Sequence, residues 1–342
     1  MCSRNNRIGG LNLLLPLIVF FLAFIFSCDT STQVDENNGE PIEYPLFEFE
    51  GEQAPLSGEI VVSKQIDNGT RQLFVMNADG SNKRQITFSE EHNFYMPRWS
   101  PDGSEIVFVS DTLLRTDGLR IGLMNDDGSN IRLLYVNGDP DLPVLGSNPA
   151  FSPDGKKIVF DHCPGCEVGV MNSYIYVFDL ETKQRSRLSE GNSWDSGPSW
   201  SKAGDRIIFS SDRDSKTALE RDLYLIEYGS DLILRVTEDS FGKAIPRWSP
   251  NDKYIAYVSR PLDRIFILEY EKEEIYFIDS MIGGERFHIP LSWSPDGSRL
   301  LVHSDSERDK DVHYLNLIDL TTMKIERVIK DSSVMSSDWL WE

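Results

Sequence analysis

The sequence of 342 residues is poor in cysteine and in basic side chains. Four cysteines are too few for a small domain that disulfide bonds hold together. Lysine and arginine number 34 against 55 aspartate and glutamate, which gives a net charge of −21 and an isoelectric point near 4.6. Such a chain lacks the basic surface that nucleic acid requires and is not attracted directly to anionic lipid. These absences leave an acidic globular body without a nucleic-acid partner.

Near the N-terminus, the longest apolar run is shorter than a membrane span. It extends over residues 11–26, is broken by Pro16 and follows Arg4 and Arg7, whereas a transmembrane helix needs about 20 apolar residues. The pattern is typical of a secretory signal peptide. An uncleaved N-terminal anchor helix is the alternative reading, and both readings place the body outside the cytoplasm, at a bacterial membrane.

The apolar run ends in Ile25-Phe26-Ser27-Cys28, which resembles the lipobox of bacterial lipoproteins. The resemblance implies that residues 1–27 are a lipoprotein signal peptide and that Cys28 is lipidated. Residues 29–58 are polar, acidic and interrupted by prolines, so we expect residues 28–58 to form a lipidated, flexible tether. The predicted location is the cell envelope, on the periplasmic or the surface side, with a lipid anchor in either the inner or the outer membrane.

The remaining chain is an internal repeat. The heptapeptide Pro97-Arg98-Trp99-Ser100-Pro101-Asp102-Gly103 recurs in variant form, with an aromatic residue every 45–52 residues or so. The aromatic positions are Trp99, Phe151, Trp200, Trp248, Trp293 and, in a degenerate last copy, Trp339. Because each copy carries one such residue, we interpret these aromatics as core rather than as a ligand platform.

Each repeat contains four predicted strands. Ser-Pro-Asp-Gly suits a type I turn, and it separates a short aromatic strand from a β-rich run such as Ile106–Ser110. A third strand, a polar turn and a fourth strand follow. Four strands in about 47 residues are the signature of a β-propeller blade. Residues 59–342 therefore predict an all-β, six-bladed propeller of four-stranded antiparallel blades, and its ring is closed by pairing the N- and C-terminal strands.

The repeated Trp-Ser-Pro-Asp-Gly, together with Phe209-Ser210-Ser211-Asp212, resembles the TolB-type, WD-repeat-like propeller family. The resemblance covers residues 59–341. It implies a non-catalytic envelope propeller, although TolB itself carries an additional α/β domain for which the predicted tether has no room. The Gly-x-Ser-x-Gly motif of propeller-bearing peptidases is absent from this sequence, so we expect no peptidase activity within this chain.

One face of the predicted ring carries the long, irregular loops. In antiparallel blades, the second-to-third and blade-connecting loops share a face, opposite the tight turns, and long loops on a rigid scaffold are the usual location of binding. The candidate binding residues on this face are His92, Tyr95, His162, Trp194, Arg213, Phe241 and His288.

A Cys-x-x-Cys lies in one of these loops. Cys163 and Cys166 have only His162 beside them, too few ligands for zinc, and a redox motif needs a helix N-terminus. In an oxidising compartment we therefore favour a local disulfide bond, with redox or zinc chemistry as the alternatives.

Two functions from different classes follow. The first is a monomeric, lipid-anchored propeller without a cofactor that binds an envelope protein or a cell-wall polymer and catalyses nothing. The alternative rests on a further resemblance, because TolB-type propellers also form oligogalacturonate lyases, which bind manganese through converging histidines and a glutamine. No matching ligand set aligns in this sequence, so we assign no metal site, and the distances among His92, His162 and His288 distinguish the two hypotheses.

Overall fold

Six four-stranded antiparallel sheets make up the computed structural model of this chain. The structure describes residues 45–51, 53–112, 118–166, 169–215, 220–238, 242–260, 264–278, 285–306, 313–330 and 334–340. The chain divides into two units, Met1–Glu43 and Tyr44–Glu342, and every named strand belongs to the second. Cys28 and the predicted signal peptide lie outside the described residues.

The strands follow the predicted order in every blade. The innermost strands are β4 (His92–Trp99), β8 (Ser147–Phe151), β12 (Ser196–Trp200), β16 (Gly242–Trp248), β20 (Glu285–Trp293) and β24 (Val334–Trp339). The second strands are β5 (Glu105–Thr112), β9 (Lys157–His162), β13 (Arg206–Ser211), β17 (Tyr254–Arg260), β21 (Arg299–Ser306) and β1 (Glu59–Gln65). The third strands are β6 (Arg120–Asn125), β10 (Tyr174–Asp179), β14 (Asp222–Glu227), β18 (Arg264–Glu269), β22 (His313–Asp319) and β2 (Arg71–Asn77). The outermost strands are β7 (Arg132–Leu133), β11 (Arg185–Arg187), β15 (Ile233–Arg235), β19 (Glu274–Phe277), β23 (Lys324–Lys330) and β3 (Arg84–Gln85).

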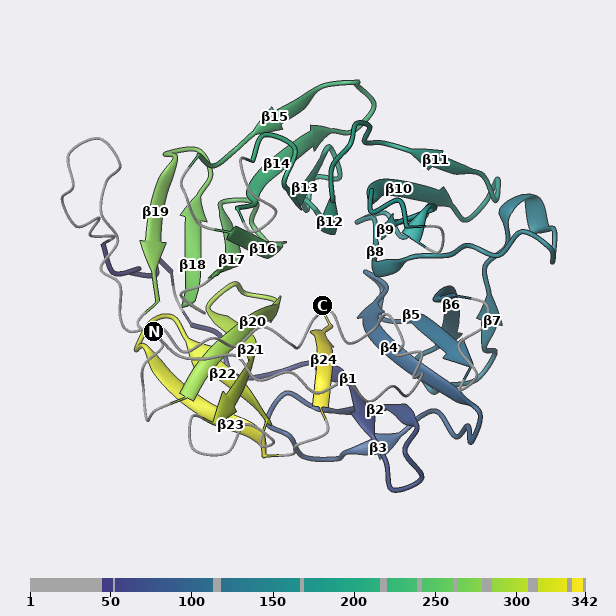
Figure 1. The fold of residues 1–342 in the computed structure, drawn as a ribbon. Helices are drawn as coiled ribbons and strands as arrows, with labels where there is room; N and C mark the ends of the chain where they lie inside the picture. Colours follow the sequence, from purple (N-terminus) through teal and green to yellow (C-terminus); the bar gives the residue numbers. More distant parts are fainter. Residues whose placement is uncertain are drawn as a thin grey trace, which may run out of the picture. The chain divides into compact units, whose positions relative to one another are not determined.

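The six blades are arranged in a ring, with their innermost strands toward its centre, as Figure 1 shows. Each innermost strand contacts the innermost strand of the next blade, in the cyclic order β24, β4, β8, β12, β16, β20. A short 3₁₀ helix, η2 (Val136–Gly138), lies in one blade-connecting segment. Among the residues described, no helix is long and apolar enough to cross a membrane. The predicted all-β, six-bladed architecture is confirmed.

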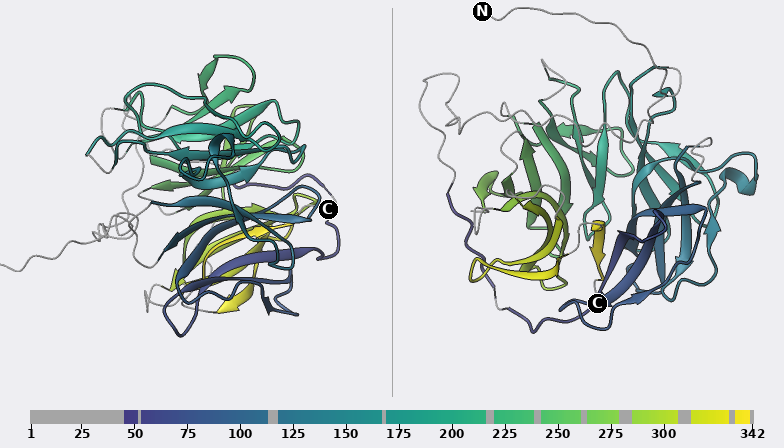
Figure 2. Two further views of the ribbon diagram at one scale, coloured as in Figure 1. Left: turned by 90° about the vertical axis from the view of Figure 1, so that its right-hand side faces the viewer. Right: turned by 60° about the horizontal axis from the view of Figure 1, so that its bottom comes forward.

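Ring closure joins the two ends of the repeat region. Strand β24 pairs antiparallel with β1, with Ile60 opposite Trp339, and the sheet continues through β2 and β3. Figures 1 and 2 show β24, in yellow, beside the purple and blue strands from the start of the propeller. This pairing confirms the predicted closure. The edge of β24 is paired with β1, a strand from the opposite end of the propeller sequence.

The Ser-Pro-Asp-Gly turns are held by their own side chains. Ser100 Oγ accepts a hydrogen bond from the backbone N–H of Glu105 at 2.9 Å and donates one to Asp102 Oδ1 at 2.6 Å. This bond to Ser100 lowers the pKa of the Asp102 carboxyl. Ser152 and Ser294 repeat the arrangement with Asp154 and Asp296. The turn is therefore a local unit that the sequence specifies in each copy.

The core lies between neighbouring blades. Trp99, for example, is buried among side chains of its own blade and of the sheet before it, including Val61 and Leu73. All six repeated aromatic residues are buried, with exposures of 0–8%, as a core position requires. Burying large aromatic rings between two sheets is the main contribution of these residues to stability.

The prediction of a flexible tether is wrong for its last part, residues 45–58. Residues 45–51 and 53–58 lie on the propeller, although the sequence predicts a flexible tether as far as residue 58. Leu46 bridges Phe277 in parallel, and Phe47 N–H donates to Phe277 O at 3.3 Å. The Phe47 ring is buried against Tyr254 and Tyr276. The segment packs because β19 otherwise offers unpaired backbone groups and an apolar pocket for one phenylalanine.

Candidate binding face

The face opposite the tight turns, called the long-loop face below, carries the second-to-third loops and the blade-connecting loops. The antiparallel order of every sheet places them there. Among the residues described, four large apolar side chains in loops of this face are exposed, which are Phe88 (79%), Leu142 (48%), Val170 (51%) and Met171 (55%). Phe88 lies between β3 and β4, Leu142 between β7 and β8, and Val170 and Met171 between β9 and β10. Exposed apolar groups of this kind are candidates for contact with a partner.

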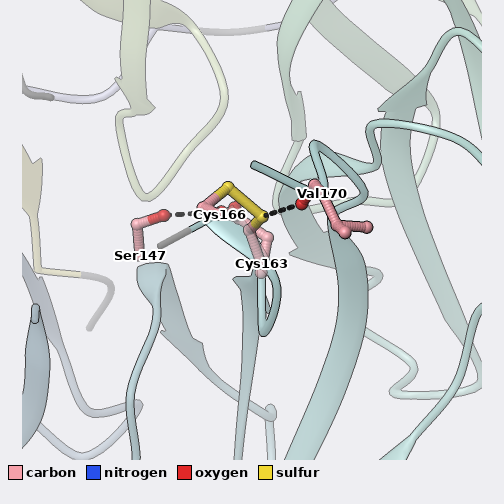
Figure 3. The surroundings of a disulfide bond; sticks show 5 residues. Ser147, Cys163, Cys166 and Val170 are labelled. Carbon is pink, nitrogen blue, oxygen red and sulfur yellow. Dashed lines mark hydrogen bonds between the residues drawn. A yellow bond between two sulfur atoms is a disulfide. The ribbon is translucent and has the colours of Figure 1, made fainter. Parts of the chain in front are cut away.

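A disulfide bond shapes the loop that presents Val170 and Met171. Cys163 and Cys166 are joined directly after β9, and Figure 3 shows the bond beside Val170. The N–H of Val170 donates to Gly165 O at 2.9 Å, and Cys163 Sγ lies 3.4 Å from Val170 O. The backbone of Val170 is thereby tied to the four residues that the disulfide bond closes, which helps to hold Val170 and the adjacent Met171 in place.

A second loop supports this one from the next blade connection. Ser173 N–H donates to Ser193 O, and Asp195 N–H donates to Ser173 O, both at 3.0 Å. The two loops thus form a short parallel bridge at Ser173 and Trp194. The side chain of Trp194 is half-buried. Its backbone N–H donates a hydrogen bond to Asp212 Oδ1 at 2.7 Å. We call Val170, Met171 and the exposed part of Trp194 the disulfide patch.

The carboxylate of Asp195 anchors the supporting loop. It is fully buried and accepts hydrogen bonds from the hydroxyls of Ser189, Ser193 and Ser211. The guanidinium of Arg213 donates to it at 2.9 Å. That guanidinium also lies over the rings of Phe209 and Tyr224, at 5.2 and 4.9 Å from their centroids. Arg213, a predicted binding residue, therefore has a positioning role in this face.

The three predicted histidines lie in different blades, on β4, β9 and β20, and Tyr95 shares β4 with His92. His92 is exposed at the first residue of β4, and Tyr95, three residues later, is half-buried with its hydroxyl 3.3 Å from Asp111 Oδ2. His162 ends β9, half-buried, with its ring 5.9 Å from that of Tyr176. Burial, and to a lesser extent the charge of Arg185, lowers the pKa of His162 from 6.5 to about 4. Its imidazole is therefore neutral at pH 7.

The structure brings together only part of the predicted set. Trp194 and Arg213 meet through Asp195 and the loop around it, and the disulfide loop joins them through Ser173. Phe241 lies outside the described residues, and His288 falls within β20 but its side chain is not among those described. In the part of the chain that is described, no three side chains from histidine, cysteine, aspartate and glutamate are placed to hold one metal ion.

Sequence reasoning missed the lining of the channel at its tight-turn end. The residue before each repeated aromatic faces a cavity there, and two of these residues are Arg98 and Arg247. The signal was in the repeat itself, because a proline stands two residues before the aromatic at Trp99, Phe151, Trp200 and Trp248.

Comparisons with known proteins match the propeller. The family profile of the TolB beta propeller domain matches residues 140–275. An uncharacterized protein of Agrobacterium fabrum is 25% identical over 260 residues, which cover 63% of this chain and 86% of that protein. The Tol-Pal system protein TolB of Francisella tularensis subsp. mediasiatica is 26% identical over 192 residues, 55% of this chain and 40% of that protein. This chain thus matches less than half the length of that TolB.

Solved structures share the fold at lower identity. TolB from Acinetobacter baumannii superimposes with a TM-score of 0.65 at 21% identity, over 84% of this chain and 67% of that one. An oligogalacturonate lyase in complex with manganese superimposes with a TM-score of 0.53 at 15% identity, over 83% and 85% of the two chains. At these identities the structural likeness describes the propeller alone.

Proposed function

Since the chain belongs to the TolB-type β-propeller family, we propose that it is a non-catalytic protein of the bacterial cell envelope that binds a partner protein through its long-loop face. The observation that carries this proposal is the disulfide patch. Val170 and Met171 are about half exposed, and a disulfide bond and backbone hydrogen bonds fix the loop that presents them.

A preorganised apolar patch suits protein binding for two reasons. Burying exposed apolar side chains in a partner supplies free energy, and a loop that is already ordered loses little conformational entropy when it binds. Half-buried aromatic side chains such as Trp194 are common among the residues that dominate binding energy at interfaces. The proposal therefore assigns the centre of the interface to the disulfide patch.

The predicted chemistry-bearing residues of this face support binding rather than catalysis. Arg213 is paired with the buried Asp195, and His162 is held neutral beside Tyr176. The pairing of Arg213 with Asp195 helps to order the loop around Asp195. The alternative is a metal-dependent lyase, a class of enzyme that shares the propeller fold with this chain. Among the described residues, no cluster of histidine, cysteine, aspartate and glutamate side chains supports it by offering a metal site.

The binding proposal is tested by pull-down from detergent-solubilised envelopes, with identification by mass spectrometry. The test variant combines Val170→Asp with Met171→Asp. The matched control is Leu232→Asp, which changes a side chain of similar exposure (45%) in a turn between β14 and β15, on the opposite face. We expect one envelope protein to be enriched by the unaltered chain and by Leu232→Asp. The double variant should lose at least about tenfold in affinity, which corresponds to about 1.4 kcal/mol. Equal enrichment by all three proteins contradicts the proposal.

We further propose that a lipid on Cys28 holds the propeller at a membrane. This rests on the lipobox-like Ile25-Phe26-Ser27-Cys28. Metabolic labelling with a fatty-acid analogue should mark the unaltered chain, and Cys28→Ser should lose the label and leave the membrane fraction. If Cys28→Ser stays in the membrane fraction, the apolar run is an uncleaved anchor helix instead.

A further inference from the structure

The segment before β1 contacts three blades of the ring. Leu46 bridges Phe277 on β19, and Ala54 N–H donates to Asp296 Oδ2 in the turn between β20 and β21. Residues 56–58 then reach the blade of β24 and β1. In the right-hand view of Figure 2 the segment is purple and runs beside the yellow strands. We call residues 45–55, of which the structure describes all but residue 52, the strap, and residues 56–58 its base.

The base belongs to the ring. Leu56 packs against the buried cluster that contains Trp339, and the indole N–H of Trp339 donates to Ser57 O at 3.0 Å. The backbone N–H of Ala78, which follows β2, donates to Gly58 O at 3.0 Å. Because these contacts join the base to both β24 and the end of β2, the base leaves its place only when the closing blade itself opens.

The strap, by contrast, is held by one buried side chain. Phe47 is 3% exposed, and its ring centroid lies 5.1 Å from that of Tyr254 and 5.7 Å from that of Tyr276, edge-on to both. Phe49 is half-buried, and every other described residue of the strap is exposed. The apolar free energy that keeps the strap on the propeller therefore comes mainly from the ring of Phe47.

The polar contacts of the strap are open to water. Lys253 pairs with Glu50 at 2.9 Å, and the Glu50 side chain is 72% exposed. Ala54 N–H donates to Asp296 Oδ2 at 2.9 Å and Ala54 O accepts from Arg299 Nη1 at 3.0 Å, both at the surface. Exposed ion pairs and hydrogen bonds add little, because water replaces them when they break. A segment with so few buried contacts opens at a lower free energy than the strands beneath it.

The order of the contacts along the chain decides which one is loaded first by a pull from the N-terminus. Coming from Cys28, the chain first meets the propeller at Pro45 and Phe47. There Phe277 N–H donates to Pro45 O at 3.1 Å, and Phe47 N–H donates to Phe277 O at 3.3 Å. The base lies at the far end of the strap. Tension applied at Cys28 therefore acts on the Phe47 contact before it acts on the base or on any blade.

We propose that the strap is a releasable extension of the membrane tether, which opens at the Phe47 contact while the propeller stays folded. With the strap docked, the 16 residues 29–44 separate Cys28 from the propeller and span at most about 55 Å. Release adds the 11 residues 45–55, or at most about 37 Å more. The propeller then meets a partner at two ranges of distance from the membrane. This gain in reach rests on the proposed lipid on Cys28, whereas the opening of the strap does not.

The first test is amide hydrogen exchange of the chain from Cys28 onward, without the lipid, at increasing low concentrations of urea. The amides of Phe47 and Phe277 report on the strap, and those of β1 and β17 report on the blades. We expect the strap amides to exchange faster, with little dependence on urea, because a local opening exposes little surface. Phe47→Ala should speed their exchange at least about tenfold. The matched control is Leu46→Ala, which removes a neighbouring side chain that is 56% exposed and should change little.

The second test is pulling of single molecules between Cys28 and Ile131→Cys, a position that is 49% exposed in the turn between β6 and β7. We expect a reversible step at low force, before the propeller unfolds, with a gain of at most about 37 Å. The step should be absent in Phe47→Ala and present in Leu46→Ala.

Two results overturn the proposal. One is strap amides that exchange at the same rate and with the same urea dependence as those of β1 and β17, and this result needs no variant. The other is a propeller that unfolds without an earlier step. Because both experiments use protein without the lipid, they succeed or fail independently of whether Cys28 is lipidated.

Discussion

Asp222 illustrates how a single carboxylate joins two blades. It is buried at the start of β14 and accepts hydrogen bonds from Thr237 Oγ1 at 3.0 Å and Arg235 Nε at 3.1 Å. Lys243, on β16 of the next blade and only 1% exposed, donates to it at 3.0 Å. A buried ion pair of this kind adds little stability compared with apolar packing, but removal of one partner leaves a charge buried without compensation.

Asp222→Ala should therefore lower the free energy of unfolding by about 3–5 kcal/mol, measured by urea denaturation. The matched control is Glu238→Ala. The Glu238 carboxylate also pairs with Arg235, at 3.2 Å, but is 82% exposed, so its loss should cost less than about 1 kcal/mol. A similar, small effect of both substitutions would show that Lys243 finds other compensation.

His162 should make stability depend on pH. Because its pKa falls from 6.5 in the unfolded chain to about 4 in the folded protein, the unfolded state binds a proton first as the pH is lowered. Stability from this group is therefore present above pH 6.5 and is lost as the pH falls from about 6.5 to about 4.

The comparison is with His162→Gln, which does not titrate, since other groups then contribute equally to both proteins. The melting temperature of the unaltered chain should fall relative to that of His162→Gln as the pH is lowered from 7 to 4. A difference between the two proteins that stays constant over this range would mean that His162 is protonated as readily in the folded state as in the unfolded one.

At the scale of one element, the disulfide loop separates stability from function. Cys163 and Cys166 enclose a very short loop, and the chain-entropy relation gives only about 2 kcal/mol for a loop of that length. Replacing both cysteines with serine should therefore shift the melting temperature by only a few degrees. Binding of the envelope partner should weaken, because Val170 and Met171 are no longer held in place.

The measurement is a thermal melt together with the pull-down of the same variant. Loss of the fold in the double serine variant would show that the bond stabilises the blade itself. Unchanged capture of the partner would show that the loop keeps its conformation without the bond.

The N-terminal segment shows a limit of sequence reasoning at the same scale. Residues 45–58 have the polar, proline-interrupted composition of a linker, and nothing in their order indicates a strand. Only the β19 edge and the pocket formed by Tyr254 and Tyr276 give Phe47 a place to pack. A segment that packs through one buried side chain carries no periodic signal, because the signal requires several alternating positions.

For the whole molecule, ring closure should determine cooperativity. Strand β24 is the innermost strand of the blade that otherwise contains β1, β2 and β3, and Trp339 is buried in the adjoining core. Deletion of residues 336–342 removes most of this strand and exposes the edge of β1 and the inter-blade core. We expect a loss of cooperative thermal unfolding, measured by calorimetry and near-ultraviolet circular dichroism.

The control for this deletion is Trp339→Phe, which keeps the strand and a buried ring and should retain a single cooperative transition at a lower temperature. If the deleted protein melts like the unaltered chain, closure by β24 contributes nothing to stability, and the ring is held by contacts between the other blades.

Local sequence patterns are sufficient to predict each blade. Turn residues such as Ser100 and Asp102, and the alternation of apolar and polar positions in the strands, act within a few residues of each other, so each repeat of about 47 residues carries its own instructions. The number of repeats and their incomplete ends then predicted six blades and closure of the ring. The long-loop face also followed, because antiparallel order decides on which side each connection lies.

Which residues meet across repeats depends on how the six blades pack and close into a ring. Arg98 and Arg247 are 149 positions apart in the sequence, and they face one cavity only because six sheets close around a channel. The bridge between the disulfide loop and Trp194 likewise depends on how a blade connection passes over its neighbour. Local patterns specify strands and turns, whereas the relative positions of distant side chains depend on packing, twist and closure, which no single repeat contains.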